Sequence, residues 1–506
     1  MRLVIALFAL AATACAHTSA INQIFAPHAV RNRPGCAVAV AEGGRTVARS
    51  AYGMASLELG VPLTPDTIFE AGSVSKQFAA AALLRLEEQG KLALDDRVRK
   101  YVPELPEAAD AVTLRHMLNH TSGLRDWGTI ADIGGWPRGT RAHTHVHVLD
   151  ILSRQRALNY TPGHRYSYSN SGYNLAAIVA ERVSGKSLPA LTRELFFQPL
   201  GMSNSSWRDD YTRVVPRRAT AYRAGLDGRY HVDMHGENIY GNCCLMTTAG
   251  DLLKWNAHLD RDEAFAEKME RQGILTSGET IEYAHGLTVS SRAGLREVSH
   301  SGATGGYRAW LARYPERELS VALLCNDGTV SPTTLGRRVA DVFLKPPRAS
   351  AVAAVPAAGF SPGLYRNETT DAVLRVFEQD GELRAGFGRS GPLLSAASLD
   401  PAAYRRVEPF TPSAEQLRDY VGDYTSDEAP ATYRVRTDSG RLRVELPQQP
   451  ERTLEPTYSD AFRLGNSTLI HFTRAGSGRV DGFDLKASFD MTGGVARVER
   501  LHFTRR

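Results

Sequence analysis

The chain has 506 residues, which is more than one ordinary domain holds, so we expect two or three domains. Its contents of 42% hydrophobic and 23% charged residues are typical of globular proteins. The formal net charge of +5 is small for this length, and the sequence has no long basic run, which argues against a nucleic-acid-binding protein.

The first 20 residues, MRLVIALFALAATACAHTSA, predict a secretory signal. Arg2 precedes an apolar run that is too short to span a membrane, and small residues follow it. Two processing routes remain open. One is cleavage after the small-x-small segment 14–16, and the other is lipidation of Cys15 in a stretch that resembles a bacterial lipobox without its usual Leu. We therefore expect a periplasmic or secreted protein, attached to a membrane only through a lipid on Cys15.

Four cysteines follow the signal: Cys36, Cys243, Cys244 and Cys325. So few cysteines in so long a chain do not form a disulfide scaffold, and we predict buried thiols. One disulfide in an oxidising compartment stays open, without an assigned pair. The adjacent Cys243 and Cys244 have no nearby pair of histidines, so we do not expect a zinc site there.

Residues 21–345 mix strand-like and helix-like runs. The segment CAVAVAEGGRTVARSAYG, residues 36–53, predicts a hairpin with its turn at Gly43 and Gly44. Residues 320–327 predict a short buried strand, and residues 333–344 predict the helix after it. Strands at both ends with helices between them predict an α/β domain whose terminal strands share one sheet.

Residues 70–90 predict a helix that ends before Gly90 and carries Ser73 and Lys76 at its start. Lys76 is one of only eight lysines in the chain, and Ser-x-x-Lys occurs nowhere else. A lysine in an apolar pocket can lose its proton and accept that of a hydroxyl one turn away, which makes Ser73 a candidate nucleophile. The helix N-terminus suits a developing oxyanion. The alternative is a serine cap beside a solvated lysine.

Two further motifs favour the catalytic interpretation. Tyr168 and Asn170 lie in PGHRYSYSNSGYN, where a tyrosine can pass a proton and an amide can both donate and accept. His300 and Gly302 form the only His-x-Gly, in EVSHSGATGGYRAW, after a stretch of strand-like alternation. A glycine at a strand edge lets backbone approach closely, and the N–H of Ala303 is placed to donate to an oxyanion. A packing tyrosine and an ordinary turn histidine are the alternatives.

The C-terminal third differs from the rest of the chain in composition and in the pattern of its apolar residues. Residues 346–358 are rich in Pro and Ala and predict a linker. Short alternating segments with Gly turns follow and predict an all-β region. Residues 363–384 match residues 422–443 without a gap at an offset of 59, with eight identities. This repeat predicts two related β modules, at 359–412 and 413–506, whose edges a meander or barrel closure would remove.

Ser-x-x-Lys, Tyr-x-Asn and His-x-Gly, in this order, resemble the motifs of the penicillin-recognising serine hydrolases. Within that family the chain is similar to the class C β-lactamase branch, which includes D-alanyl carboxypeptidases, D-aminopeptidases and family VIII esterases. The resemblance spans roughly residues 25–345 and implies a β-lactamase/transpeptidase-like α/β (α+β) domain. Further matching segments are TIFEAGSVSKQF, VTLRHMLNHTSGL, PGHRYSYSNSGY, TTAGDLLKW and HSGATGGY.

The resemblance implies a role for each residue of the first two motifs. Ser73 would be the acylated nucleophile, and Lys76 its base or a proton relay. Tyr168 would protonate the leaving group and help to activate the deacylating water. Asn170 would orient Lys76 and the substrate amide. Whether Lys76 or Tyr168 is the acylation base stays open.

The third motif departs from the class C pattern. The resemblance places His300 and Gly302 on the substrate-binding strand, with the N–H groups of Ser73 and Ala303 as the oxyanion hole. Class C β-lactamases usually carry a lysine at the position of His300. A histidine is mostly neutral at pH 7, which weakens the case for substrates with a free C-terminal carboxylate. His-x-Gly is the form found in D-aminopeptidases, which also carry two lipocalin-like β modules, with a loop of the last one reaching the active site.

We therefore predict an extracytoplasmic serine hydrolase, similar to D-aminopeptidases, that acylates Ser73 and acts on small D-amino-acid peptides, amides or esters. The expected fold is the catalytic α/β domain followed by all-β, lipocalin-like antiparallel barrel modules. The alternatives are a family VIII-type carboxylesterase, a weak β-lactamase or D-alanyl carboxypeptidase, and a non-enzymatic penicillin-binding sensor or scaffold. We expect a small-molecule or short-peptide substrate and no metal or organic cofactor. The oligomeric state stays open.

Several histidines suggest a metal site at first sight. His143, His145 and His147 alternate, but the helix predicted to continue from them scatters them over different faces. His116 and His120 lie one turn apart without a third ligand, so we interpret them as packing or capping residues.

Overall fold

The structure is a computed structural model that describes residues 16–344, 359–379, 381–386, 394–395, 399–465, 467–489 and 496–506. The lipobox-like stretch with Cys15, most of the predicted signal and the predicted linker at 346–358 lie outside these residues. Residues 16–25 are helical, and the 3-10 turn η1 (Ala26–His28) follows them.

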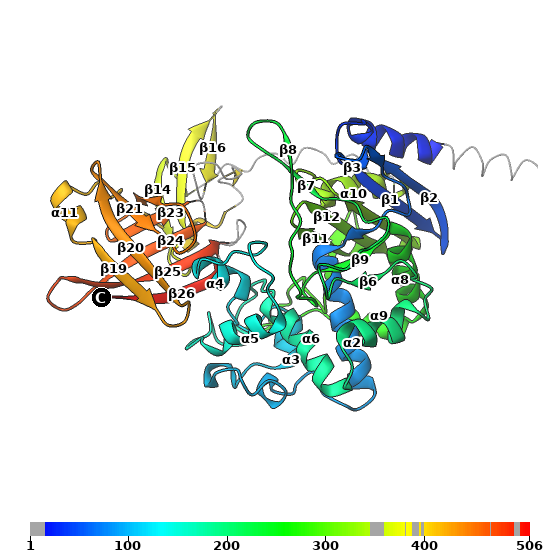
Figure 1. Cartoon of the computed structure of the whole chain (residues 1–506), viewed down its shortest axis with the longest axis horizontal. Coiled ribbons are helices and arrows are strands. Elements are labelled where there is room, and N and C mark those ends of the chain that lie inside the picture. The colour runs from blue at the N-terminus through cyan, green and yellow to red at the C-terminus, as the bar shows by residue number, and fades with distance from the viewer. Residues whose placement is uncertain are drawn as a thin grey trace, which may run out of the picture.

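A six-stranded antiparallel sheet forms the centre of the first domain, with the strand order β10-β11-β12-β13-β1-β2 (Figure 1). Ala39 of β1 lies opposite Ala322 of β13, so the strands at the two ends of the domain share one sheet, as predicted. The predicted hairpin is confirmed, and Gly43 and Gly44 at its turn adopt positive φ angles of 56° and 71°. The strands are β1 (Cys36–Glu42), β2 (Arg45–Tyr52), β10 (Thr288–Arg292), β11 (Leu295–Thr304), β12 (Tyr307–Tyr314) and β13 (Leu319–Cys325).

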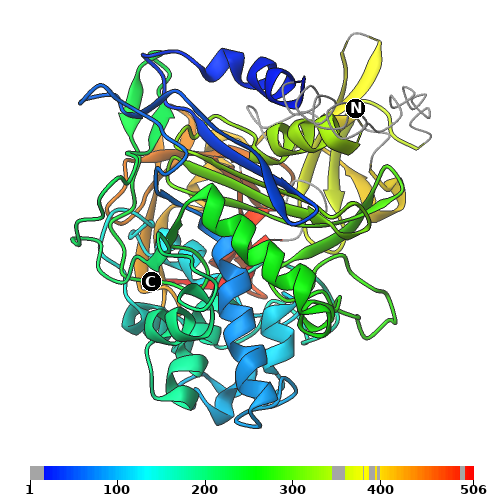
Figure 2. The ribbon, with the colours of Figure 1, turned by 90° about the vertical axis from the view of Figure 1, so that its right-hand side faces the viewer.

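The two faces of this sheet bury different cores, because successive side chains of a strand point to opposite faces. Ala37 and Ala39 of β1 pack with α2 (Lys76–Glu88), α6 (Ser171–Ser184) and α8 (Ala249–Arg261). Val38 and Val40 pack instead with α10 (Pro332–Leu344) and residues 16–25. Figure 2 shows α10 and the N-terminal helix on one face of the sheet and α2 and α8 on the other. The predicted helix at 333–344 is thus confirmed as α10.

The predicted helix at 70–90 is confirmed as two segments. Its first turn is the 3-10 helix η2 (Gly72–Ser75), and α2 continues from Lys76 and ends before Gly90. The other helices are η3 (Val98–Lys100), η4 (Glu107–Ala109), α3 (Leu114–Leu118), α4 (Trp127–Ile133), α5 (His145–Ser153), α7 (Leu188–Thr192), the π-helical η5 (Arg193–Phe197), α9 (Glu263–Met269) and η6 (Pro315–Arg317). None of the helices in the described ranges is both long and apolar enough to cross a membrane.

Short strands join these helices in three small sheets. In the sheet β5-β9-β6, Phe69 of β5 lies opposite Thr247 of β9, and the chain continues from β5 into η2. The strands are β3 (Met54–Ser56), β4 (Val61–Pro62), β5 (Phe69–Glu70), β6 (Ser206–Trp207), β7 (Tyr222–Ala224), β8 (Tyr230–Val232) and β9 (Leu245–Thr247).

The C-terminal region is all β, as predicted, and its two modules differ. The described strands of the first form a five-stranded antiparallel sheet in the order β17-β16-β15-β14-β18, and those of the second close into an eight-stranded antiparallel barrel, β19 to β26. The sequence repeat aligns β14 with β19 and β16 with β21 at the offset of 59. The elements are β14 (Gly363–Asn367), β15 (Val373–Gln379), β16 (Glu382–Gly386), β17 (Leu394–Ser395), η8 (Pro401–Ala403), β18 (Tyr404–Val407), α11 (Ala414–Arg418), β19 (Gly422–Ser426), β20 (Ala431–Asp438), β21 (Arg441–Glu445), β22 (Arg452–Pro456), β23 (Ala461–Leu464), β24 (Thr468–Arg474), β25 (Val480–Phe489) and β26 (Ala496–Arg505).

The barrel docks on the first domain through α4, which lies beside β26 (Figure 1). Ile130 and Ile133 of α4 belong to the hydrophobic core of the barrel. At the same interface Arg125 forms an ion pair of 2.6 Å with Glu428, and these side chains are only 4% and 11% exposed. A shared core and a buried ion pair therefore fix the barrel against the first domain.

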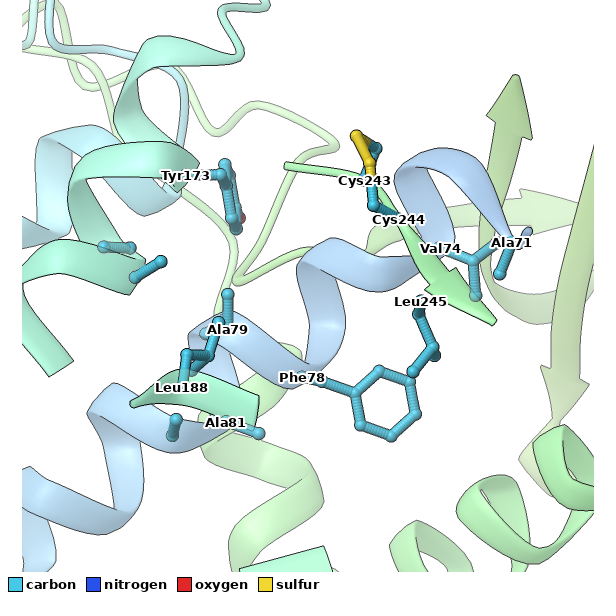
Figure 3. Close-up of a cluster of buried hydrophobic side chains, with 14 of the residues drawn as sticks. Ala71, Val74, Phe78, Ala79, Ala81, Tyr173, Leu188, Cys243, Cys244 and Leu245 are labelled. Carbon is cyan, nitrogen blue, oxygen red and sulfur yellow. A yellow bond between two sulfur atoms is a disulfide. The ribbon is translucent and has the colours of Figure 1, made fainter. Parts of the chain in front are cut away.

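The prediction of buried thiols is wrong, because the structure pairs all four cysteines. Cys36 and Cys325 are directly opposite each other on β1 and β13 and form a disulfide. Cys243 and Cys244 form a second disulfide between sequence neighbours, visible in Figure 3. The strand register and the positive φ of Cys244 bring these sulfur atoms together, and neither feature is visible in the sequence.

Candidate active site

Ser73 and Lys76 meet at the junction of η2 and α2. The Nζ atom of Lys76 lies 3.1 Å from the Oγ atom of Ser73, so the predicted one-turn proximity is confirmed. The Lys76 side chain is completely buried, and the alternative of a solvated lysine is therefore wrong. Burial lowers its pKa well below the usual lysine value, and the positive charges of Arg138 and Arg497 lower it further.

The remaining contacts of Lys76 determine where its lone pair points. Its Nζ atom lies 3.0 Å from Oδ1 of Asn170 and 2.7 Å from the carbonyl oxygen of Asn242, and both oxygens can only accept. In the neutral amine these two oxygens take both N–H bonds. The lone pair then faces Ser73, where it can accept the hydroxyl proton.

Asp126 holds Asn170 in the orientation that this network needs. Its Oδ2 atom accepts hydrogen bonds from the backbone N–H of Asn170, at 2.8 Å, and from the Nδ2 of Asn170, at 3.1 Å. The amide nitrogen of Asn170 is thereby directed to Asp126, and its oxygen is left for Lys76. Asp126 caps α4, and the helix that positions the barrel therefore also positions Asn170.

Tyr168 contacts the opposite side of the Ser73 hydroxyl. Its OH group donates to Ser73 Oγ at 2.8 Å. Burial raises the pKa of Tyr168 to about 12, so the phenol stays protonated at neutral pH. The ring packs on His120 with a centroid distance of 4.2 Å, and the nearby Tyr283 meets it edge-on. Tyr168 OH, Ser73 Oγ and Lys76 Nζ thus form one chain of proton donors and acceptors.

The segment of β11 with His300 and Gly302 lies against η2, and two glycines permit this approach. A Cβ atom on Gly302 would lie 2.0 Å from the carbonyl oxygen of Ala71, and one on Gly72 would lie 2.5 Å from the backbone nitrogen of Ala303. Both distances are impossible for a real side chain. The backbone of β11 therefore passes close to Ser73, which places the N–H groups of Ser73 and Ala303 at one end of the same pocket.

His300 is neutral in this structure, and both of its ring nitrogens already have hydrogen-bond partners. Burial lowers its pKa to about 3. Its Nδ1 atom lies 2.5 Å from the carbonyl oxygen of Ser301, which can only accept, so Nδ1 carries the proton. Its Nε2 atom therefore accepts from the OH group of Tyr283, at 2.8 Å. His300 has no proton and no positive charge to offer a substrate carboxylate.

These residues surround a pocket of about 540 Å³. Of the seven predicted site residues, six line it, and Lys76 lies buried beneath Ser73. The sequence reasoning missed Asp126, Asn242, Tyr283 and Arg497. Asp126 precedes an apolar helix in the manner of a cap, but its contact with Asn170 has no sequence signal. Arg497 belongs to β26, and only the docking of the barrel brings it to the pocket. The lining residues are Ser73, Arg138, Tyr168, Asn170, Asn242, Cys243, His300, Ser301, Gly302, Ala303, Arg308, Pro332, Thr333 and Arg497.

In the described ranges of the chain, no three His, Cys, Asp or Glu side chains are grouped to hold a metal ion. The three alternating histidines are used elsewhere. His143 contacts the carbonyl oxygen of Trp136, and His145 that of Tyr240. His147 completes the capping box of α5.

Known proteins resemble this chain in both of its parts. Residues 21–343 match the Beta-lactamase family, and residues 406–500 match a family described only as a domain of unknown function. The chain is 30% identical over 317 residues to penicillin-binding protein 4* of Bacillus subtilis, which covers 57% of this chain and 67% of the relative. It is 26% identical over 438 residues to the D-aminopeptidase of Brucella canis, covering 81% of this chain and 82% of that protein.

A solved structure shows the same fold over nearly the whole chain. It is the octameric penicillin-binding protein homologue from Pyrococcus abyssi, with a TM-score of 0.59 and 22% identity. The superposition covers 97% of this chain and 99% of that one. The likeness therefore includes the C-terminal β region as well as the first domain.

Proposed function

The chain belongs to the beta-lactamase family, and from this premise we propose that it is a serine hydrolase that forms an acyl-enzyme at Ser73. The observation that carries the proposal is the donor chain from Tyr168 OH to Ser73 Oγ to Lys76 Nζ, with distances of 2.8 and 3.1 Å. It ends at an amine whose pKa burial lowers well below the usual lysine value, and an amine in its neutral form is the proton acceptor that a serine nucleophile needs.

Acylation follows from this geometry. Lys76 accepts the proton of Ser73 as Oγ attacks the substrate carbonyl, and the negative charge develops on the carbonyl oxygen. The N–H groups of Ser73 and Ala303 stabilise that oxyanion. Lys76 is the better candidate for the base, because the raised pKa of Tyr168 keeps the phenol protonated.

Tyr168 then transfers protons in both steps, to the leaving group and from the attacking water. Its hydroxyl, already directed at Ser73 Oγ, donates a proton to the departing nitrogen or oxygen, and the proton that Lys76 took from Ser73 replaces it. In the second step a water attacks the acyl group, and Tyr168 relays the water's proton to Ser73 Oγ as that atom leaves the acyl carbon. Asn170, which Asp126 holds in place, orients the Lys76 amine through its amide oxygen. The side-chain amide of Asn170 also faces the substrate.

The substrates we propose are small D-amino-acid peptides, amides or esters. Support comes from the D-aminopeptidase relative, whose similarity runs through the catalytic domain and into the C-terminal β region. The pocket of about 540 Å³ is bounded on one side by Arg497 of the barrel, which suits a short substrate. We further propose that the protein works outside the cytoplasm. The predicted signal and the two disulfides support that location, since disulfides persist in oxidising compartments.

The first test is hydrolysis of D-alanyl p-nitroanilide beside its L-isomer and its N-acetylated form. The enzyme should release p-nitroaniline from the D-isomer, and Ser73→Ala should abolish this release while leaving the thermal unfolding midpoint unchanged. Mass spectrometry of a quenched reaction should find the acyl group on Ser73. Activity that persists in Ser73→Ala would refute the nucleophile. Activity restricted to p-nitrophenyl esters would make the family VIII-type esterase the better assignment.

A further inference from the structure

We propose that Arg497, which the C-terminal barrel inserts into the catalytic pocket, binds a carboxylate on the leaving group of the substrate. The inference rests on the proposed acyl transfer at Ser73 and specifies its substrate class. The preferred substrates would be those whose leaving group is an amino acid with a free carboxylate, ahead of simple amines, amides and alcohols.

The backbone of Arg497 is anchored to the catalytic domain. Its carbonyl oxygen accepts hydrogen bonds from the N–H of Asp126, at 3.2 Å, and from Nδ2 of Asn159, at 2.9 Å. The Oδ1 atom of Asn159 accepts in turn from the N–H of Glu499 at 2.9 Å, and the Glu499 carboxylate pairs with Arg165 at 3.0 Å. The start of β26 is therefore held on the rim of the pocket at a defined position.

The side chain of Arg497 points at the catalytic groups. Its guanidinium carbon lies 5.5 Å from the ring centroid of Tyr168, the same ring whose hydroxyl contacts Ser73. Because Tyr168 delivers the proton to the leaving group, a cation beside its ring is next to the leaving group. The acyl carbonyl instead faces the N–H groups of Ser73 and Ala303.

Of the charged side chains that line the pocket, Arg497 is the one that is available to bind an anion. The lining contains three arginines and, within the described residues, no aspartate or glutamate. Arg138 is neutralised by an ion pair of 2.7 Å with Glu237. Arg308 uses Nη1 on the carbonyl oxygens of Gly305 and Tyr307, at 2.7 and 2.8 Å.

Arg497 differs from both of these arginines. Its guanidinium forms no ion pair or hydrogen bond with any described residue, although it is only half-exposed. Asp126, whose pKa the charge of Arg497 lowers, already accepts hydrogen bonds from Asn170 and Thr129. A planar guanidinium with free N–H groups is the donor that matches a carboxylate in a bidentate way.

This assignment also explains how the site works without a cation on β11. His300 is neutral and both of its ring nitrogens are occupied, so β11 offers no positive charge. Arg497 would supply that charge from the other side of the pocket, and from a different domain.

The test compares two pairs of substrates that differ only in a leaving-group carboxylate. The first pair is D-alanyl-D-alanine and D-alanyl-D-alaninamide, and the second is the acetyl ester of 4-hydroxybenzoate and that of its methyl ester. The wild-type enzyme should prefer the carboxylate member of each pair. Arg497→Gln should lower kcat/KM for that member by about 10- to 100-fold and leave the neutral member within about twofold. Arg497→Lys should restore part of the preference.

Arg500→Gln is the matched control, because Arg500 lies on the same strand but outside the pocket and is exposed. It should behave as wild type. In the unmodified enzyme the preference should also fall as salt rises, which checks the charge without any substitution. Equal rates for both members of each pair, or an equal loss of both in Arg497→Gln, would overturn the assignment and leave the serine hydrolase intact. Failure of the wild-type enzyme to hydrolyse any of the four would refute the proposed function itself, and the role of Arg497 with it.

Discussion

The two walls of the pocket are built on different physical principles. The wall from the catalytic domain carries Ser73, Lys76 and Tyr168. Burial there lowers the pKa of the Lys76 amine, which favours its neutral form, and raises the pKa of the Tyr168 phenol, which keeps it protonated. The wall from the barrel carries Arg497, a partly exposed charge whose guanidinium has no ion-pair or hydrogen-bond partner among the described residues. The comparison suggests that bond cleavage and substrate selection reside in separate domains and can be altered separately.

Breaking the catalytic wall should have the largest effect. Lys76→Arg keeps a basic, hydrogen-bonding side chain but replaces a group that can be neutral with one that stays protonated. We expect kcat/KM to fall by about 10²- to 10⁴-fold for charged and neutral substrates alike, because the proton acceptor is lost. Single-turnover acylation rates would measure this.

A loss confined to substrates with a carboxylate would contradict the division between the walls. The thermal unfolding midpoint serves as the control for folding, since a buried guanidinium is larger than the amine that it replaces.

Gly302→Ala tests the approach of β11 to η2. The new Cβ atom would meet the carbonyl oxygen of Ala71 at 2.0 Å, so the strand or the 3-10 turn must move. We expect about a 100-fold loss of kcat, because the N–H groups of Ser73 and Ala303 lose their alignment with the oxyanion. Gly476→Ala is the control, since a Cβ atom there meets no atom within 4 Å. An active Gly302→Ala enzyme would exclude this oxyanion geometry.

The difference between the walls also separates what the sequence predicts from what it does not. Ser73 with Lys76, and Tyr168 with Asn170, are close in the chain, so local spacing already places them on one turn or one helix start. Arg497 follows Ser73 by more than four hundred residues, and its position depends on how α4 enters the core of the barrel. Asp126 and Tyr283 act through contacts with other side chains, which no spacing encodes.

The same limit applies to the fold. Periodicity predicted the β1–β2 hairpin, α10 and the sharing of a sheet by β1 and β13. It did not predict the disulfide between Cys36 and Cys325, because the pairing register depends on the whole sheet. The repeat predicted two related modules, and its aligned segments contain matching strands. Barrel closure is a tertiary property of β22 to β26, which lie beyond the aligned repeat.

Weakening the interface between the barrel and the catalytic domain should change the substrate preference more than the rate of bond cleavage. Glu428→Gln removes one charge of the buried pair with Arg125, which we expect to cost about 3–5 kcal/mol of interface stability. The preference for leaving-group carboxylates should then fall, while hydrolysis of the neutral acetyl ester persists.

Asp427→Asn is the control for that substitution, because Asp427 pairs with Arg156 at the surface and its side chain is 84% exposed. Its effect should stay below about 1 kcal/mol. Limited proteolysis and thermal unfolding would compare the two variants. Equal behaviour of both would mean that the Arg125–Glu428 pair does not hold the barrel.

The smallest expected effect is the influence of the Arg497 charge on the pKa of Lys76. It can be measured from the acid limb of the pH–rate profile. Acylation needs neutral Lys76, so the rate of hydrolysis of a neutral ester should rise with pH through the pKa of that amine. Arg138 and Arg497 lower this pKa and Asp126 raises it. Arg497→Gln removes one positive charge, which makes protonation of Lys76 easier, so the acid limb should move to higher pH. Arg497→Lys keeps the charge and should leave the limb in place. A limb that does not move in Arg497→Gln would mean that the two walls are electrostatically independent and that Arg497 acts on the substrate alone.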